Sequence, residues 1–273
     1  MKPAPDDAEF RMLTQQIARE RGIACDSYKD KCLRRRIAVR MRARGVHTFT
    51  EYARLLHSDT HEYDQLLDAL TINVTKFYRN PETWNALRPH LAELWRERGG
   101  AVRCWSAGSA SGEEPYTIAV LLCETARLQH QEALLVKASV DATDIDRESL
   151  ARTEQASYAE VAFQEMPADL VRRWFTAETP RQPVPAVRKL VRVTKFDLLR
   201  QKPLRAPYDL IVCRNVVIYF DRASQEKLFL QFAEALAPGG RLVLGKVETL
   251  FGAARERLQL ADARERIYRR PPA

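Results

Sequence analysis

The organisation of the chain follows from one stretch, Val102-Arg-Cys-Trp-Ser-Ala-Gly-Ser-Ala-Ser-Gly-Glu-Glu-Pro-Tyr116. Its first residues are an apolar run preceded by two glycines, which predicts a buried strand over residues 101–105. Small residues fill the turn at 107–112, and an amphipathic helix follows. Strand, glycine-bearing turn and helix together let a ligand approach backbone N–H groups at a helix N-terminus.

The chemistry of this turn argues against a phosphate ligand. Gly108 and Gly112 form G-x-x-x-G, which is neither the G-x-G-x-x-G of dinucleotide folds nor a P-loop. Glu113 and Glu114 follow, and carboxylates suit a ligand with a cationic centre and free hydroxyls, such as S-adenosylmethionine (SAM). An ordinary strand-to-helix turn, with acids that complement the helix dipole, explains the same residues. The turn alone leaves both interpretations open.

Length and composition limit the remaining possibilities. The 273 residues allow one α/β domain and one small partner domain. The net charge of +8 favours acidic partners, whether nucleic acid, an anionic membrane or an acidic protein surface. Five cysteines without a C-x-x-C pair indicate a reducing setting without structural zinc. Because there is no signal peptide and no long apolar run, we expect a cytoplasmic protein without membrane insertion.

Residues 1–70 predict helices only, and we expect a helical N-terminal domain there. One helix closes at Gly22, and a second covers about 28–44 and stops at Gly45. The second helix carries eight basic residues against the single Asp30. A charge run of this kind is commonly a solvated helix face, but its self-repulsion also fits docking of an acidic partner.

From residue 99 onward strands and helices alternate, which predicts a doubly wound, mostly parallel sheet. A linker and a connecting helix would occupy 71–98, and the second domain 99–273. Prolines at 179–187 indicate a loop or a ragged edge strand. Apolar runs predict the later strands at 134–140, 190–196, 208–213, 241–245 and 264–269, the last of them at an edge.

Polar side chains gather where these predicted strands end, which is where open α/β sheets bind their ligands. One acid in that position is commonly a helix cap, as Asp144 or Asp146 could be for the helix that follows. Several in the same topological position favour a nucleoside-type cofactor. The candidates are Gly108, Glu114, Asp144, Asp197, Leu198, Arg214 and Asn215.

Several segments, in order along the chain, are similar to those of one family. They are Leu70-Thr-Ile-Asn-Val-Thr-Lys-Phe-Tyr-Arg79, Trp105 to Tyr116, Ala142-Thr-Asp-Ile-Asp146, Phe196-Asp-Leu-Leu199, Tyr208-Asp-Leu-Ile-Val-Cys-Arg-Asn-Val-Val-Ile-Tyr-Phe-Asp221 and Leu236-Ala-Pro-Gly-Gly240. With them the chain resembles the CheR-type methyltransferases of bacterial chemoreceptors. The resemblance implies an α/β fold of the class I SAM-dependent, Rossmann-like kind, an N-terminal all-α domain, and a small β-rich excursion at about 179–195.

The resemblance also implies an activity: methyl transfer from SAM to glutamate side chains on a cytoplasmic chemoreceptor helix. The products would be glutamyl methyl esters and S-adenosyl-L-homocysteine. No metal is implied, and we expect a monomer. By motif position, the resemblance implies cofactor contacts at Asn73, Thr75, Arg79, Glu114, Asp144, Asp197, Leu198, Arg214 and Asn215. Gly108 is added to these candidates because it follows the first strand.

Two further groups of residues receive roles from the resemblance. Arg79 and Tyr219 fall where family members place groups near the transferred methyl, which makes them the catalytic candidates. Because receptor methylation regions are acidic helices, the basic helix could dock them. The docking candidates are Arg34, Arg36, Arg40 and Arg44.

One departure from the family pattern lies on the substrate side. The family usually has Gly-His-Ser-Glu after the fifth strand, where this chain has Gly245-Lys-Val-Glu248. Two alternative functions stay open. The net charge of +8 keeps a nucleic-acid methyltransferase possible, although Arg214-Asn-Val-Val differs from the Asn/Asp-Pro-Pro-Tyr of base-reading sites. Lys246-Val247 keeps possible a non-catalytic signalling module that binds SAM.

Overall fold

The computed structural model describes residues 5–70 and 75–272, and the chain divides into two compact units. By their contacts, the first unit comprises residues 1–72 with 219–225, and the second comprises 73–218 with 226–273. No helix in the described part of the chain combines the length and apolar character needed to cross a bilayer.

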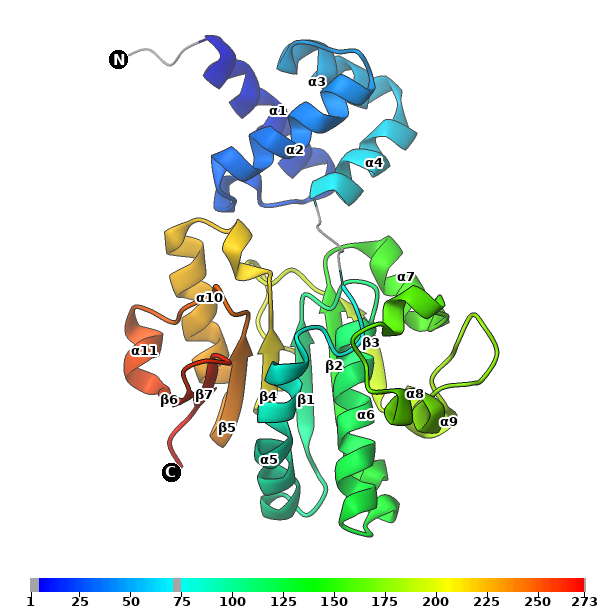
Figure 1. The fold of residues 1–273 in the computed structure, drawn as a ribbon. Coiled ribbons are helices and arrows are strands. Elements are labelled where there is room, and N and C mark those ends of the chain that lie inside the picture. Colours follow the sequence, from blue (N-terminus) through cyan, green and yellow to red (C-terminus); the bar gives the residue numbers. More distant parts are fainter. Residues whose placement is uncertain (1–4, 71–74, 273) are drawn as a thin grey trace. The chain divides into compact units, whose positions relative to one another are not determined.

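The first unit is helical, as its sequence predicts (Figure 1). Its apolar stripes meet in a core that includes Leu13, Ile37, Tyr52 and Leu66, each at most 1% exposed. Helix α1 packs on α3, and α2 packs on α4. The helices are α1 Pro5–Arg21, η1 Cys25–Ser27, α2 Asp30–Ala43, α3 Phe49–Ser58 and α4 Thr60–Leu70.

Local signals set the ends of these helices. Gly22 and Gly45 follow α1 and α2 with φ of 77° and 65°, a backbone conformation that favours glycine and stops a helix. Helix α3 begins with a capping box, in which the Thr48 side chain accepts from the Glu51 N–H and the Glu51 carboxylate accepts from the Thr48 N–H.

The second unit is built on one seven-stranded sheet in the order β3-β2-β1-β4-β5-β7-β6 (Figure 1). Strands β1 to β5 run parallel, and β7 pairs antiparallel with both β5 and β6. The strands are β1 Arg103–Ala107, β2 Ser139–Asp144, β3 Val191–Lys195, β4 Tyr208–Cys213, β5 Leu236–Leu244, β6 Gln259–Asp262 and β7 Ile267–Arg269.

Helices cover both faces of this sheet. On one face, Cys104 of β1 joins a core cluster with residues of α5 and α6, which lie side by side. Its neighbour Trp105 points to the other face, where its ring contacts Phe232 of α10. The helices of this part are α5 Pro81–Glu97, α6 Glu113–Leu128, α7 Arg147–Gln155, α8 Ala168–Trp174, α9 Pro185–Arg188, α10 Arg222–Ala235 and α11 Ala253–Arg257.

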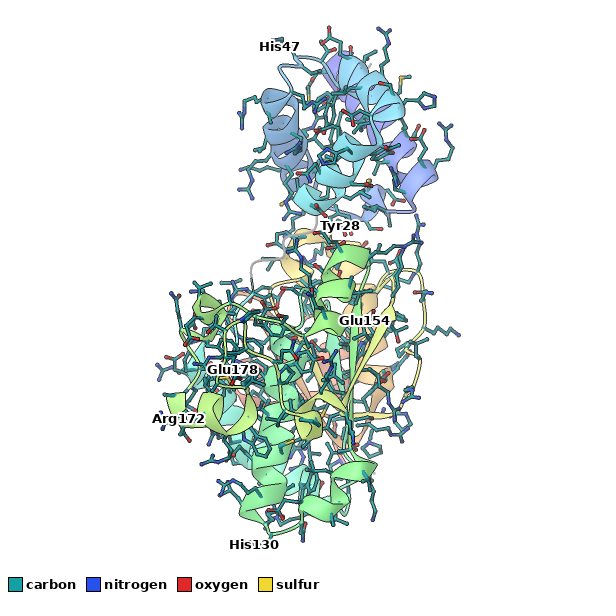
Figure 2. The ribbon with its side chains drawn as sticks, turned by 90° about the vertical axis from the view of Figure 1, so that its right-hand side faces the viewer. Tyr28, His47, His130, Glu154, Arg172 and Glu178 are labelled. Atoms are coloured by element: carbon teal, nitrogen blue, oxygen red, sulfur yellow. The ribbon has the colours of Figure 1, made fainter. Side chains whose placement is uncertain are left out.

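Figure 2 turns the α7–α9 side of the second unit toward the viewer, with Glu154 on α7, Arg172 on α8 and Glu178 in the loop between α8 and α9. The β-rich excursion predicted at 179–195 takes a different form here. Its first part makes two isolated bridges, Tyr158 with Arg181 and Phe175 with Pro183, and then forms α9. Its last residues are β3, which belongs to the main sheet.

Two strand predictions need correction. In the run 134–140, residues Glu132–Lys137 form a 3₁₀ helix, and the strand begins only at Ser139. Val136 in this run is 90% exposed, so its apolar character does not reflect burial. The predicted last strand is β7, which lies between β5 and β6 and is not an edge. The edge strand on this side of the sheet is β6, whose residues are mostly exposed and give no strand pattern.

Candidate functional site

The turn between β1 and α6 is fastened to β2. The backbone N–H groups of Gly108 and Ser109 both donate to the Thr143 carbonyl, at 2.9 Å each. Gly108 has φ of 81°, and a Cβ there would lie 2.5 Å from Cγ2 of Val216. Both the positive φ and the lack of space for a Cβ require glycine at this position. Because glycine has no side chain, this turn can pack against the segment that follows β4.

Asp144, the last residue of β2, holds the same turn. Its Oδ2 accepts from the Ala110 N–H at 2.9 Å, and its Oδ1 accepts from the Asp146 N–H at 3.0 Å. Burial raises the pKa of this carboxyl against the opposing effect of these bonds. The helix cap is Asp146, whose oxygens accept from the first N–H groups of α7. The structure thus separates the two aspartates that the sequence left equivalent.

Glu114 lies in the first turn of α6, directly after the same turn, and is half-buried. Its Oε1 accepts from the Ser106 hydroxyl at 2.8 Å. Burial raises the pKa of Glu114 to about 7, while the Arg214 cation and the Ser106 bond oppose the shift. Glu113 points elsewhere and accepts from the Ser111 hydroxyl at 2.8 Å. At neutral pH Glu114 is therefore divided between its neutral and ionised forms.

Arg214 follows β4 and is a buried cation, 6% exposed. Its Nη2 donates to Oδ1 of Asn80 at 2.8 Å, and its guanidinium carbon lies 5.2 Å from the centre of the Trp84 ring. Among the described residues, no carboxylate oxygen lies within ion-pair distance of it, and its Nε has no hydrogen-bond partner. Burial lowers the pKa of Arg214, and the Glu114 carboxylate opposes that shift.

Glu248 shapes the segment between β4 and α10. Its carboxylate accepts from three backbone N–H groups, those of Gly245 at 2.6 Å, Asn215 at 3.1 Å and Ile218 at 3.3 Å. Asn215 has φ of 61°, a conformation that asparagine tolerates better than most residues. The glutamate that this chain shares with the family motif is therefore the residue that fixes the turn carrying Asn215.

The two residues that depart from the family motif do not hold this turn. The Lys246 ammonium pairs with Glu82 at 3.3 Å and with Glu265 at 3.7 Å. Val247 is 74% exposed. The replacement leaves the contacts of Glu248 in place and adds an exposed apolar side chain beside them.

The segment before α5 is fastened to the second unit at several points. The Tyr78 N–H donates to Oγ1 of Thr117 on α6 at 3.1 Å, and the Trp84 indole N–H donates to the Arg79 carbonyl at 2.9 Å. Thr75 is half-buried, whereas Asn73 lies outside the described residues. The backbone of Arg79 is thereby fixed, and its charge acts on both Glu114 and Arg214.

Asp197 and Leu198 follow β3, next to the end of β2. The Phe196 N–H donates to the Asp144 carbonyl at 2.8 Å, which joins the two strand ends. Oδ1 of Asp197 accepts from the Leu199 N–H at 2.9 Å, and Leu198 is buried. In the second unit the structure therefore brings the predicted residues at the ends of β1 to β4 to one edge of the sheet.

Tyr219 groups with the helical unit by its contacts. Its carbonyl accepts from the Lys29 N–H at 3.0 Å, and the Arg36 guanidinium lies 4.3 Å from its ring centre. These contacts involve its backbone and ring face, and its part in catalysis stays a prediction.

The four arginines predicted to dock a substrate all have partners inside the helical unit. Arg34 pairs with Asp6 and Asp7. Arg36 is 7% exposed and donates to the Leu70 carbonyl. Two guanidinium nitrogens of Arg40 meet the carboxylate of Glu62, a fully buried residue, at 3.0 and 2.6 Å. Arg44 reaches Asp59 at 2.8 Å.

The contacts of Glu62 show that the basic helix α2 stabilises the fold of the first unit. Burial raises the pKa of its carboxyl, but bonds from Arg40 and from the Tyr52 hydroxyl outweigh burial and leave the pKa below its usual value. Losing Arg40 would leave a buried carboxylate uncompensated, which costs about 3 kcal/mol of folding free energy. Substitutions at Arg36 or Arg40 would therefore report on folding as well as on any docking.

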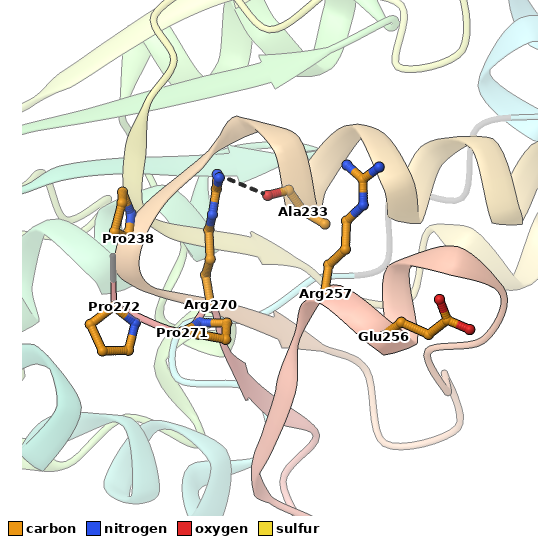
Figure 3. Close-up of a pocket in the computed structure, with 7 residues that line it drawn as sticks. All are labelled: Ala233, Pro238, Glu256, Arg257, Arg270, Pro271 and Pro272. Carbon is orange, nitrogen blue, oxygen red and sulfur yellow. Dashed lines mark hydrogen bonds between the residues drawn. The ribbon is translucent and has the colours of Figure 1, made fainter.

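A cavity of about 470 Å³ lies far from these strand ends, beside Pro238 near the start of β5 (Figure 3). The Arg270 guanidinium in its wall donates to carbonyls at the end of α10, including that of Ala233 at 3.3 Å. Arg257 donates to Glu234 at 2.9 Å. None of the predicted site residues lines this cavity, so it is separate from the site at the strand ends.

Three residues of the site escaped prediction from sequence. Asn80 and Trp84 lie just beyond the matched segment that ends at Arg79, and Ser106 lies inside β1. Asn80-Pro81 did carry a signal, since asparagine before proline is typical of a turn and Asn80 has φ of 59°. No local pattern announces that Asn80 bonds to Arg214, 134 residues later.

Comparisons with known proteins agree with this arrangement. Residues 73–267 match the family model "CheR methyltransferase, SAM binding domain", and residues 8–71 match "CheR methyltransferase, all-alpha domain". The chain is 34% identical over 261 residues to a chemotaxis protein methyltransferase of Klebsiella aerogenes, which covers 92% of this chain and 86% of that protein. It is 33% identical to that of Escherichia coli, over 90% and 85%, and 31% identical to that of Listeria monocytogenes, over 92% and 94%.

Proposed function

Because this chain belongs to the CheR methyltransferase family and is a SAM-dependent methyltransferase, we propose that it methylates glutamate side chains of a chemoreceptor in chemosensory signalling. The observation that carries the proposal is the match of both units, in order, to the two domains of one family. The relatives that align over about nine-tenths of the chain are named chemotaxis protein methyltransferases, which supports a role in chemosensory signalling.

The residues at the strand ends fit SAM as a ligand. Two half-buried acids with raised pKa values, Glu114 and Asp144, suit a ligand that carries hydroxyls and positive charge. The Ser109 hydroxyl and Nε of Arg214 are buried without a hydrogen-bond partner among the described residues, so both can serve a ligand. We propose that the cofactor is held by Glu114, Asp144, Arg214 and Asn215, with Thr75, Gly108, Asp197 and Leu198 beside them, and with Asn73 and Arg79 from the preceding segment.

A glutamate acceptor explains what chemistry the chain must supply. When bound, SAM supplies a methyl group on a sulfonium centre. A glutamate side chain has a reference pKa of about 4.3 and is ionised near pH 7, so it needs no general base from the protein. The protein has to align the carboxylate and remove its water.

Arg79 is proposed to orient the acceptor and not to stabilise charge. Charge on the acceptor carboxylate falls as the ester forms, so a tight cationic clamp would stabilise the reactant more than the transition state. The bond from the Trp84 indole to the Arg79 carbonyl fixes the backbone from which this side chain extends. Tyr219 is proposed to donate one hydrogen bond to the same carboxylate.

For docking of an acidic receptor helix, α2 offers other residues than the four internally paired arginines. Lys31, Arg35, Val39 and Arg42 recur at intervals of three or four, so they share one face of the helix. All four are exposed, Val39 to 49%, and within the described residues the side chains of the three cations make no hydrogen bond or ion pair. We propose that this α2 stripe, and not the four internally paired arginines, contacts the receptor.

Reversing two charges of the α2 stripe tests this surface. We expect Arg35→Glu with Arg42→Glu to raise the KM for receptor at least about 10-fold, because each reversal removes an attraction of about 0.5–1 kcal/mol and adds a repulsion. Binding of SAM, measured by calorimetry, should not change. Arg11→Glu with Arg54→Glu is the matched control, since both residues are exposed cations on other helices of the same unit. Equal effects of the two double variants would contradict the assignment.

A transfer assay with radiolabelled SAM tests the acceptor class. Receptor cytoplasmic fragments, RNA and DNA are offered separately to the full chain. We expect label on the receptor fragment that is released as methanol by mild alkali, which is the behaviour of a carboxyl methyl ester. Alkali-stable label on RNA or DNA would refute the proposal in favour of a nucleic-acid methyltransferase.

A further inference from the structure

Arg214 is held in an unusual way for a buried cation. Buried guanidinium groups are generally paired with a carboxylate, because an isolated buried charge is costly. Here the partner within hydrogen-bond distance is the neutral amide oxygen of Asn80, and the Trp84 ring covers the guanidinium at 5.2 Å. An aromatic face attracts a cation without neutralising it. The two contacts therefore fix the position of Arg214 and leave its full charge.

Asn80 is itself built into place. It has φ of 59°, a left-handed conformation that asparagine adopts more readily than most residues. Its backbone N–H donates to Oε2 of Glu165 at 2.8 Å, and Pro81 begins α5 directly after it. The Asn80 side chain thus projects from a fixed turn toward the end of β4.

We propose that Asn80 is a positioning residue of the cofactor site: its amide oxygen holds the Arg214 guanidinium at the end of β4 without an ion pair, so that the cation acts on Glu114 and on the ligand. The proposal rests on the assigned contact between Arg214 and SAM. An aspartate in place of Asn80 would bind Arg214 equally well but would neutralise it.

The charged groups around this pair define what a substitution would change. Arg214 faces Glu114, Arg79, Glu248 and Glu265, and Glu114 faces Arg214, Arg79 and Glu248. Of the two cations near Glu114, Arg214 has the larger effect in keeping its carboxyl ionised. A carboxylate at position 80 would therefore make Glu114 harder to ionise, and this effect can be measured through the ligand.

The test is SAM affinity measured by calorimetry between pH 6 and 9 on the full chain. The affinity should fall on the acid side as Glu114 takes up a proton. Asn80→Asp is expected to move the midpoint of that fall upward by about one pH unit. Asn85→Asp is the matched control, because Asn85 is exposed on α5, which begins directly after Asn80, and it accepts from the Tyr78 hydroxyl and does not contact Arg214. A purely structural role for Asn80 would change stability and leave the midpoint in place.

A second variant guards against a folding defect. Asn80→Gly keeps the left-handed turn and removes the amide, so affinity at pH 8 should fall several-fold because Arg214 is no longer held. An unchanged midpoint in Asn80→Asp, or wild-type affinity at pH 8 in Asn80→Gly, would overturn the proposal. Both measurements concern SAM binding alone, so they stand whether or not a chemoreceptor proves to be the acceptor.

Discussion

Replacing Asp144 with alanine is expected to raise the dissociation constant for SAM roughly 30- to 150-fold, which corresponds to about 2–3 kcal/mol of binding free energy. The carboxylate is lost as an acceptor for the ligand. The turn between β1 and α6 also loses its anchor, because the Ala110 N–H no longer has its partner. Isothermal calorimetry with the purified protein measures the change directly.

Asp146 provides the control, two residues away. Asp146→Ala removes the cap of α7, which accepts from the N–H groups of Glu148 and Ser149. Thermal unfolding should show a loss of about 1 kcal/mol of stability, while SAM affinity stays at the wild-type value. If the two alanine variants bound SAM equally well, the assignment of Asp144 to the cofactor would be wrong.

The second large effect is a dependence of SAM affinity on pH. Burial raises the pKa of Glu114 to about 7 in the free protein. An ionised carboxylate accepts hydrogen bonds from ligand hydroxyls and attracts positive charge, so binding favours the ionised form and lowers this pKa. Affinity should therefore fall by up to about tenfold for each pH unit below 7 and level off above it. Calorimetry in buffers of different ionisation enthalpy should show proton release on binding at pH 6.

Glu114→Gln separates this effect from other titrating groups, including those of the ligand. The variant should bind more weakly at pH 8 and should lack the part of the pH dependence that Glu114 contributes. In the free protein the same raised pKa means that Glu114 reduces stability increasingly as pH rises from about 4.5 to about 7. A pH profile of SAM binding shared by Glu114→Gln and the wild type would exclude Glu114 as a ligand of the cofactor.

The sequence predicted those strands that are buried on both faces. Residues Tyr208–Cys213 are all buried and, apart from Asp209, apolar, so prediction and structure agree there residue for residue. The run 134–140 is also mostly apolar, yet its first part belongs to a 3₁₀ helix in which no residue is buried. Periodicity over such short runs does not distinguish burial from exposure. Strand β6 has neither an apolar run nor an alternating pattern, and it was missed.

Prediction of the functional site from sequence was limited for another reason. A sequence shows which residues are charged but not which residues they pair with. The basic helix was expected to offer its arginines to a receptor, whereas Glu62 and Asp59 on the neighbouring segment engage Arg40 and Arg44. Glu248 was recognised as part of a motif, but its bonds to Asn215 and Ile218 span about thirty residues. Contacts of this range depend on the order of strands in the sheet, which the local pattern does not encode.

The central claim is that the acceptor is a receptor glutamate. Co-expression of the full chain with a chemoreceptor, followed by peptide mass spectrometry, tests it most directly. We predict a mass increase of one methyl group on specific glutamates of the receptor cytoplasmic helices, and its loss in the Asp144→Ala variant. Receptor peptides free of methyl esters, from cells in which the wild-type chain is expressed and binds SAM, would contradict the claim.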